Sequence, residues 1–372
     1  MKSTLNDRAL MRRALRLARR GLGTVSPNPM VGALLVKNGR VLGRGWHQRA
    51  GQPHAEIEAF RDAERQGNVV RGATLYVTLE PCSTFGRTPP CTEAIIRSGV
   101  ERVVVAAMDP NPNHAGKGFD LLREKGLKVT TGILAEEASE LNEAFNHWIV
   151  QRTPFVTVKA AMTLDGKIAN SNGESKWITG EAARARGMQL RQGTDAILVG
   201  INTILADNPS LTVRNASGQP EEPGRLRRIV LDSQARTPLW STVVSDSFAS
   251  LTTIVATESA SKRKVNALRK NATVLIAPGQ GRIELPWLLK WLGSQNVTSL
   301  LVEGGGEVNA AFLFGRQANR VAFFYAPKIL GGWNSMKAVS GSGVERLAEA
   351  LRLSKIRWSQ LGQDLFLEAD VA

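Results

Sequence analysis

Cysteine is scarce in this chain of 372 residues, in which Cys82 and Cys91 are the only two. Such a sequence has no disulfide framework, which is typical of proteins from a reducing compartment, so we expect a cytoplasmic protein. The sequence also lacks any run of 18 or more apolar residues, so no transmembrane helix is predicted. Its first residues lack the apolar segment of a signal peptide, and we expect no membrane partner.

Acidic residues are outnumbered, with 33 Asp and Glu against 48 Lys and Arg, and the formal net charge is +15. A charge of this size favours anionic partners, which can be nucleic acid or a phosphorylated metabolite and cofactor. The densest basic run, Arg12–Arg20, is interleaved with Leu10, Leu15 and Leu17 in the pattern of an amphipathic helix. We expect a solvated polar face there, with a binding patch as the alternative.

The length predicts two domains, since domains commonly have about 100 to 200 residues. Hydrophobic residues make up 42% and charged residues 22% of the chain, which is typical of globular proteins. We expect one α/β domain over residues 1–147 and a second over residues 148–372.

Helix and strand signals alternate along both domains. The Asn38-Gly39 pair between β-rich runs predicts a hairpin turn, and Pro90 ahead of Gly99 predicts a helix start and its end. In the first domain we expect helices over 5–20, 54–66, 90–98 and 118–125 and strands over 32–36, 40–45, 73–79, 103–107 and 127–130. In the second we expect helices over 182–192 and 308–314 and strands over 155–160, 195–199, 228–231, 252–256, 273–276, 299–302 and 322–325.

The clearest chemical pattern is His54-Ala55-Glu56, followed by Pro81-Cys82 and Cys91. One imidazole and two thiolates suit zinc and leave a fourth position for water, whose pKa the metal lowers toward about 7. A carboxylate that does not bind the metal is then needed to move protons, and Glu56 is the candidate. His-x-Glu followed by Pro-Cys is typical of zinc nucleobase deaminases, although their cysteines are usually separated by two residues and not by eight.

A redox-active cysteine pair is the competing interpretation, but it leaves His54 and Glu56 unexplained. A third alternative is a zinc-stabilised RNA-binding or scaffold protein, which requires four protein ligands, whereas the pattern contains three. His114 and His147 are expected at the surface or at an interface.

The second half has no Gly-x-Gly-x-x-Gly after an early strand, so the ordinary dinucleotide-binding fingerprint is missing. Its glycine signal is Gly304-Gly305-Gly306, between a strand-like run and a predicted helix. Such a turn allows backbone N–H groups to approach a phosphate, but a tight turn without a ligand fits equally well. The residues alone therefore predict an α/β domain that can bind phosphate.

Longer motifs make the sequence identifiable. In the first half they run from Pro27 to Gly32, Gly43 to His47, His54 to Glu56, Thr78 to Ser83, Gly86 to Cys91 and Asp109 to Pro112, and in the second from Lys159 to Lys167, Gly173 to Thr179, Gly200 to Arg214, Leu231 to Ser233 and Val302 to Gly306. They resemble the bifunctional riboflavin-biosynthesis deaminase–reductase family over nearly the whole chain. The wide cysteine spacing is that family's own form of the site.

The resemblance implies a cytidine-deaminase-like three-layer α/β/α domain that binds one Zn²⁺ through His54, Cys82 and Cys91, with Glu56 as the catalytic proton shuttle. Asn28, His47 and Arg87 match the substrate positions. Taken singly, these three fit a turn residue, a packed strand-edge histidine and a surface arginine. Family members often carry histidine where this chain has Thr84, so one substrate contact differs.

For the second half, the resemblance implies a dihydrofolate-reductase-like α/β domain that uses NADPH. The family's cofactor positions correspond to Ala161, Ile168, Trp177, Thr203, Asp207, Ser233, Gly305, Gly306 and Glu307. Its substrate positions correspond to Lys159, Ser175, Arg191, Leu211, Arg214 and Glu303. Arg191 and Arg214 suit a phosphate because guanidinium can bind it bidentately, and we expect Lys159, Asp207 and Glu303 near the reacting ribose.

The implied function is deamination of 2,5-diamino-6-(5-phosphoribosylamino)pyrimidin-4(3H)-one, followed by reduction of its phosphoribosyl group. We expect a phosphorylated small molecule as the partner, no nucleic acid, and a homo-oligomer. The alternative is a deaminase that edits tRNA or single-stranded DNA, which the net charge favours and the second half opposes.

Overall fold

The computed structural model describes residues 2–85, 89–112, 114–214, 218–220 and 225–372, and the chain forms two compact units, Met1–Arg152 and Thr153–Ala372. The division follows α6 (Glu143–Gln151). The boundary predicted after His147 falls inside this helix, which continues without interruption to the end of the first unit. Within the described ranges, no helix is both long and apolar enough to cross a membrane.

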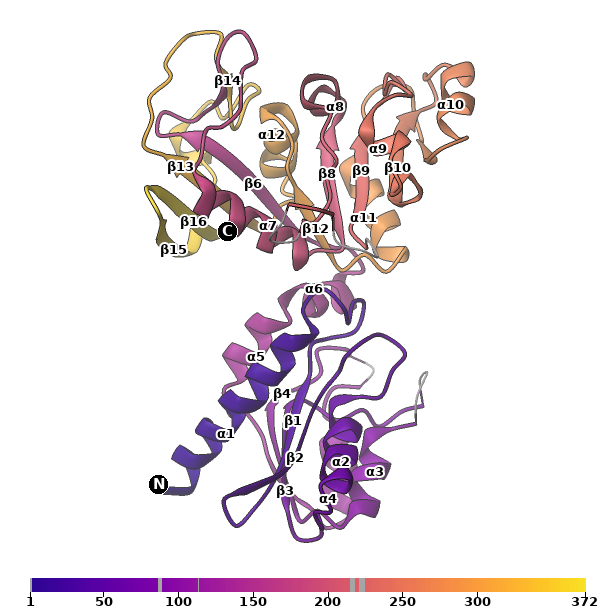
Figure 1. Ribbon diagram of the computed structural model, residues 1–372, viewed down its shortest axis with the longest axis vertical. Helices are drawn as coiled ribbons and strands as arrows, with labels where there is room; N and C mark the ends of the chain where they lie inside the picture. The colour runs from indigo at the N-terminus through magenta and orange to yellow at the C-terminus, as the bar shows by residue number, and fades with distance from the viewer. Residues whose placement is uncertain (1, 86–88, 113, 215–217, 221–224) are drawn as a thin grey trace. The chain divides into compact units, whose positions relative to one another are not determined.

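The first unit is built on a five-stranded sheet of order β2-β1-β3-β4-β5 (Figure 1). The strands are β1 (Gly32–Lys37), β2 (Arg40–Trp46), β3 (Thr74–Leu79), β4 (Arg102–Ala107) and β5 (Lys128–Thr130). β1 pairs antiparallel with β2 and β3, and the remaining neighbours are parallel. Asn38 and Gly39 both have positive φ, 50° and 77°, as a tight hairpin turn requires, so the predicted hairpin is confirmed.

Helices cover both faces of this sheet. One face carries α2 (Ala55–Arg65), α3 (Cys91–Ser98) and α4 (Lys117–Glu124), and the other carries α1 (Lys2–Ala18) and α5 (Ala135–Leu141), with a 3-10 turn, η1 (Arg19–Gly21), after α1. Ala59, Ile95 and Leu122 enter the first core, whereas Met11 and Ala138 enter the second. The three-layer α/β/α arrangement is therefore confirmed.

The basic run lies on α1 and the turn that follows it. Leu10, Leu15 and Leu17 are buried against the sheet. The arginines of the same run are exposed, namely Arg12, Arg13, Arg16, Arg19 and Arg20. This is the amphipathic helix that the spacing predicts.

The second unit contains a nine-stranded sheet of order β11-β10-β9-β8-β12-β6-β13-β16-β15. Its strands are β6 (Phe155–Thr163), β8 (Ala196–Gly200), β9 (Arg227–Leu231), β10 (Thr252–Thr257), β11 (Thr273–Ala277), β12 (Ser299–Val302), β13 (Arg320–Ala326), β15 (Leu353–Leu361) and β16 (Asp364–Val371). From β11 to β13 all neighbours are parallel, and the hairpin β15–β16 adds antiparallel strands at one edge. A separate two-stranded sheet joins β7 (Lys167–Ala169) to β14 (Met336–Lys337).

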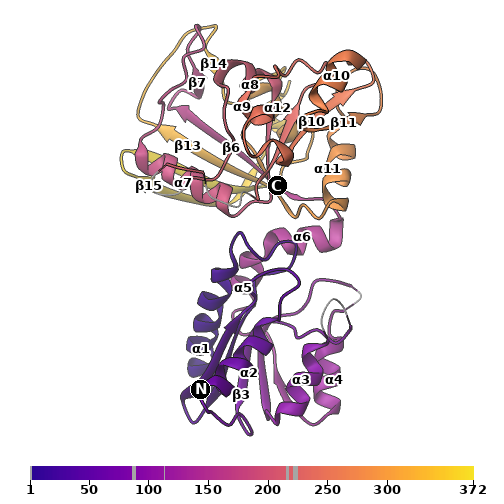
Figure 2. The same ribbon diagram turned by 45° about the vertical axis from the view of Figure 1, so that its right-hand side comes forward.

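The helices of the second unit also lie on both faces of its sheet, and Figure 2 shows them in a turned view. α11 (Leu285–Ser294) and α12 (Gly306–Phe314) pack on one face. α7 (Glu181–Gln192), α8 (Ile201–Asp207), α9 (Thr242–Ser245) and α10 (Lys262–Leu268) pack on the other. Short 3-10 turns, η2 (Ala249–Leu251) and η3 (Leu347–Glu349), complete the unit. The predicted α/β class is confirmed, while α8 to α11, β7, β14 and the β15–β16 hairpin were not predicted.

Candidate functional site

The three predicted zinc ligands meet at the start of two helices. His54 is the N-cap of α2, Cys91 is the first residue of α3, and Cys82 follows β3. His54 Nδ1 lies 3.5 Å from Cys82 Sγ and 3.3 Å from Cys91 Sγ, and the ligand atoms all lie within 4.8 Å of one another. One imidazole nitrogen and two sulfurs are the donors that zinc prefers, and a three-ligand set leaves room for water. The residues present therefore fit a catalytic zinc ion.

The cysteines are free thiols placed for metal binding. The Cys91 backbone N–H, at the start of α3, donates to Cys82 Sγ at 3.3 Å. Hydrogen bonding from the Cys91 thiol, together with His54, lowers the pKa of Cys82 to about 4. The same thiol contact and burial raise the pKa of Cys91. Both sulfurs bind a metal ion as thiolates, so metal binding displaces the protons that they carry.

Glu56 lies in the first turn of α2 and is 3% exposed. Burial raises the pKa of Glu56 to about 7, against the opposing effect of the His54 charge. A carboxyl with a pKa near neutrality can both accept and release a proton, which is the property of a general acid–base group.

Two glycines allow α2 to lie directly on β2. A Cβ at Gly45 would stand 2.2 Å from the Ala55 carbonyl oxygen, and a Cβ at Gly43 would stand 2.3 Å from the Ala59 carbonyl oxygen. No other residue fits at either position without displacing the helix. Gly43 and Gly45 of β2 therefore fix the distance between β2 and the start of α2, and with it the position of His54.

Asn28 and His47 lie beside the ligand cluster. The His47 ring packs edge-on against His54, with centroids 5.4 Å apart. Its Nδ1 lies 3.1 Å from the Pro53 carbonyl oxygen, and its Nε2 lies 3.0 Å from Asn28 Nδ2. Burial lowers the pKa of His47, so a neutral ring donates from Nδ1 and accepts at Nε2 from the Asn28 amide. Arg87, the third predicted substrate residue of this half, lies outside the described residues.

Buried polar side chains that sequence reasoning missed hold the loops around this cluster. The Asn142 amide accepts from the Met30 N–H at 2.7 Å and donates to the Met30 carbonyl at 2.9 Å, which fixes the loop that carries Asn28. Glu80 accepts the backbone N–H groups of Asp109, Gly116 and Gly118 at 3.2, 3.0 and 2.9 Å, respectively. Asn142 is 112 residues from Met30, so no local pattern indicates the contact.

Thr84, the residue at which the sequence departs from the expected family motif, lies next to a histidine. Its Oγ1 is 3.3 Å from Nδ1 of His114, which follows β4. His114, expected at the surface or at an interface, is half-buried beside the loop that joins the two cysteines.

Several of the predicted reductase residues lie in or after the carboxyl-terminal halves of neighbouring parallel strands, the edge where open α/β sheets bind their ligands. Lys159 and Ala161 lie on β6, Ser233 follows β9, and Glu303 follows β12. Thr203 and Asp207 lie on α8, directly after β8.

Glu303 is the centre of a buried charged network. The Arg191 Nε and Nη2 atoms donate to its two oxygens at 2.8 and 2.9 Å, and Lys159 Nζ lies 3.4 Å from Oε2. Burial raises the pKa of Glu303, but the charges of Arg191 and Lys159 outweigh this effect and lower it to about 2. Glu303 is therefore ionised throughout the physiological range.

Arg191 was expected to bind a phosphate. The Nε–Nη2 edge of its guanidinium binds Glu303, and Nη1 donates to the Thr212 carbonyl at 3.0 Å, so fewer of its five donors remain for a phosphate. Arg214 is exposed, with Nη2 3.0 Å from Ser210 Oγ, and retains donors for a phosphate. Leu211, which lies between Ser210 and Thr212, is buried, and its φ is 52°.

A second polar group joins Ser175 to Asp207, with Ser175 Oγ 3.4 Å from Oδ1. Lys176 reaches the same carboxylate at 3.7 Å. Trp177 is 66% exposed, and the Arg184 guanidinium stacks 4.9 Å from its ring centroid. Ile168 packs against Ala160, Met162 and Ala338.

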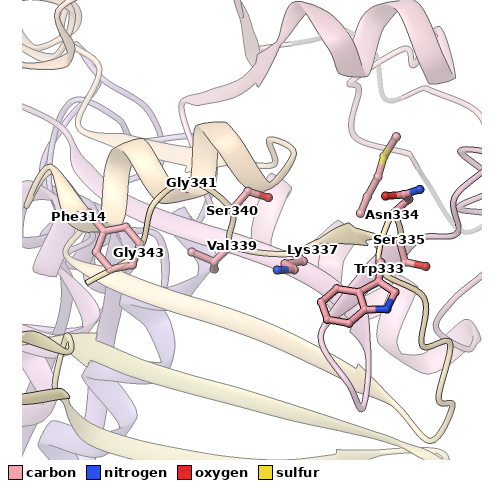
Figure 3. A pocket seen from close by; sticks show the side chains of 10 residues that line it. Phe314, Trp333, Asn334, Ser335, Lys337, Val339, Ser340, Gly341 and Gly343 are labelled. Atoms are coloured by element: carbon pink, nitrogen blue, oxygen red, sulfur yellow. The ribbon is translucent and has the colours of Figure 1, made fainter. Parts of the chain in front are cut away.

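The glycine turn leads into α12, with Gly305 as the N-cap and Gly306 and Glu307 in the first turn. A Cβ at Gly305 would meet open space, whereas one at Gly306 would stand 2.3 Å from the Lys337 carbonyl oxygen. A cofactor can thus approach the backbone at Gly305, which fits a bound dinucleotide phosphate. A pocket of about 350 Å³ lies along α12 (Figure 3), between Phe314 and the segment from Trp333 to Gly343, and none of the predicted cofactor residues line it.

Two protein families match the chain. The cytidine and deoxycytidylate deaminase zinc-binding region matches residues 4–107, and the RibD C-terminal domain matches residues 154–367. The first range contains the zinc cluster with Glu56, and the second contains the Glu303 network.

Full-length relatives agree with both matches. Riboflavin biosynthesis protein RibD of Actinobacillus pleuropneumoniae is 41% identical over 367 residues, which cover 98% of this chain and 95% of that protein. A structure of Acinetobacter baumannii RibD is 36% identical, with a TM-score of 0.87 and 99% of each chain covered. The crystal structure of a Thermotoga maritima diaminohydroxyphosphoribosylaminopyrimidine deaminase and 5-amino-6-(5-phosphoribosylamino)uracil reductase is 34% identical, with a TM-score of 0.85 and 100% of each chain covered. These relatives give no support to the nucleic-acid editing alternative.

Proposed function

Since this chain belongs to the riboflavin biosynthesis protein RibD family, we propose that each of its two units carries one of the two activities at the residues described above. The chain is a bifunctional deaminase and reductase of riboflavin biosynthesis that uses Zn²⁺ and NADPH. The deaminase is assigned to Met1–Arg152 and the reductase to Thr153–Ala372.

In the deaminase unit, 2,5-diamino-6-(5-phosphoribosylamino)pyrimidin-4(3H)-one loses its ring amine as ammonia. Bound at His54, Cys82 and Cys91, zinc supplies Lewis-acid activation of the water that hydrolyses the amine. Glu56 accepts one proton from the attacking water and delivers it to the ring nitrogen, and it then transfers the second proton of that water to the leaving amine. Asn28, oriented by the neutral His47 ring, forms the wall that holds the pyrimidine.

In the reductase unit, NADPH supplies a hydride to C1 of the ring-opened ribose, which gives the phosphoribityl product. Hydride transfer depends on orientation of the two reactants. Glu303 has a pKa of about 2, so we assign it no proton transfer. It orients Lys159, whose ammonium group is the proton-bearing side chain beside the ribose, while Arg214 receives the phosphate.

The observation that carries this assignment is Glu56, buried in the first turn of the helix that begins at the metal-binding His54. Glu56→Gln removes the proton shuttle and retains every metal ligand. We expect ammonia release to fall by about 100- to 10,000-fold, with zinc content and NADPH oxidation of the deaminated product unchanged. Ammonia release and NADPH oxidation are followed separately on the purified full chain, and normal ammonia release would overturn the role of Glu56.

We further propose that the enzyme is a homo-oligomer whose interface covers the edge of the second sheet formed by β15 and β16. Trp358 on β15 and Leu365 on β16 are 58% and 44% exposed, and exposed apolar groups gathered in this way indicate an interaction surface. Light scattering of Leu365→Glu should show a smaller particle than the native chain. Leu239→Glu, at a residue 48% exposed elsewhere in the same unit, is the matched control. An unchanged mass for Leu365→Glu contradicts this interface.

The partner class is a small phosphorylated pyrimidine. Location in the cytoplasm stays a prediction from the sequence, and the free state of both cysteines is consistent with a reducing compartment.

A further inference from the structure

Arg228 is a fully buried arginine in the middle of the second unit. It lies on β9 and has 0% exposure, which is unusual for a charged side chain. Sequence reasoning gave it no role, because it looks like one more residue of a strand. An arginine is kept in such a place only if its donors and its charge are satisfied by the protein.

All the N–H donors of Arg228 have partners. Nη1 and Nη2 donate to the Asp246 carboxylate at 2.7 and 2.8 Å, and Nε donates to Thr252 Oγ1 at 2.8 Å. The two remaining donors bind backbone carbonyls, that of Val243 at 3.0 Å and that of Ser210 at 2.9 Å. The guanidinium therefore joins β9, the α9 region and the loop after α8 through one planar group.

The loop after α8 needs such an anchor. It includes Asn208 and Leu211, whose φ angles are 41° and 52°. Residues other than glycine seldom adopt this left-handed backbone region. On its other side, the Asn208 side chain accepts from the Thr242 N–H at 2.8 Å. Ser210 is thus held from within the core by Arg228, and from Ser210 the chain runs directly into Leu211 and Arg214.

We propose that Arg228 is a positioning residue for the reductase, which sets the loop from Asn208 to Arg214 so that Arg214 meets the phosphate of the substrate. This inference rests on the proposed substrate role of Leu211 and Arg214. Asp246, the charge partner of Arg228, keeps the guanidinium in the plane that reaches the Ser210 carbonyl oxygen.

The test replaces the pair without leaving a buried charge. In Arg228→Met/Asp246→Leu both charges are removed together, and such apolar replacements commonly preserve stability. The loop loses its anchor at Ser210, so KM for the deaminated substrate should rise about 10- to 100-fold. KM for NADPH and the rate of ammonia release should stay within about twofold, because Arg228 makes no contact with either site.

A matched control exists in the same unit. Arg320 on β13 lies four strands from β9 in the same sheet, is 8% exposed and binds Asp370 at 2.7 Å. Arg320→Met/Asp370→Leu should change the midpoint of thermal unfolding without changing KM. If the Arg228 double variant does not fold, Arg228→Lys, which keeps the charge but cannot make all these bonds, carries the test and should give an intermediate KM.

The variant Arg214→Gln separates the substrate role of Arg214 from the positioning role of Arg228. An unchanged KM in this variant contradicts the substrate role of Arg214 itself. If Arg214→Gln raises KM but folded Arg228 variants keep the native KM, Arg228 serves stability alone and the positioning role is overturned. A selective rise in KM for the substrate in both the Arg214 and the Arg228 variants supports the positioning role.

Discussion

At the scale of single residues, environment decides what each ionisable group can do. Glu56 is 3% exposed as a residue and the Glu303 side chain is 11% exposed, yet the pKa values of these two glutamates lie on opposite sides of the ordinary value. Burial dominates at Glu56 and raises its pKa to about 7, whereas Arg191 and Lys159 dominate at Glu303 and lower its pKa to about 2. One carboxyl is suited to proton transfer and the other to holding cations in place.

The Glu303 network predicts a pH-dependent stability of the second unit. Because the folded pKa lies below the ordinary value, the stabilisation is complete above about pH 4.5 and is lost as the pH falls toward about 2. Glu303→Gln should lower the free energy of unfolding by about 3 kcal/mol near neutrality, since it leaves buried cations unpaired. Urea unfolding at about pH 7 and about pH 3 should show this difference shrinking at the lower pH. An equal difference at both pH values contradicts the low pKa.

At the scale of elements, close packing of α2 on β2 positions His54 and Glu56. Gly45 permits that packing, since its added Cβ would lie 2.2 Å from one α2 backbone atom and 2.4 Å from another. Crowding of this kind in a packed core commonly costs about 1–3 kcal/mol and shifts the backbone. The site is therefore sensitive to a methyl group that touches no ligand.

Gly45→Ala should weaken zinc binding and lower ammonia release by about tenfold or more, because a shift of about 1 Å in a catalytic group can reduce activity 100-fold. Zinc retained after dialysis against a chelator and initial rates of ammonia release measure the effect. Gly281→Ala, where no atom lies within 4 Å of the added Cβ, is the control. NADPH oxidation should be native in both variants, and full zinc retention in Gly45→Ala would count against the packing argument.

Elements with a local signal were predicted from the sequence. The Asn38-Gly39 turn and the short apolar runs of β1, β3 and β4, which are buried on both faces, define the first sheet, and both cysteines of the proposed zinc cluster stand in short motifs. β15 was missed because nearly all its residues are exposed and most of them are polar, so its sequence does not show the buried face that marks a strand. The contacts of Asn142 and Arg228 were missed because their partners are distant in sequence. Long-range hydrogen bonds leave no periodicity to detect.

At the scale of the whole molecule, the chain combines two units with separate cores and separate chemistry. The proposed zinc ligands and Glu56 all belong to the first unit, and the residues proposed for NADPH and ribose all belong to the second. Loss of metal should therefore affect only one activity. This independence also makes each activity an internal control for variants in the other unit.

The most direct measurement compares the full chain before and after removal of zinc, with ammonia release from the pathway substrate and NADPH oxidation by the deaminated product followed separately. We expect the stripped protein to lose ammonia release, to regain it when zinc is restored, and to oxidise NADPH at the native rate throughout. Undiminished ammonia release from a metal-free chain would contradict the account, and so would simultaneous loss of both activities in a protein that remains folded.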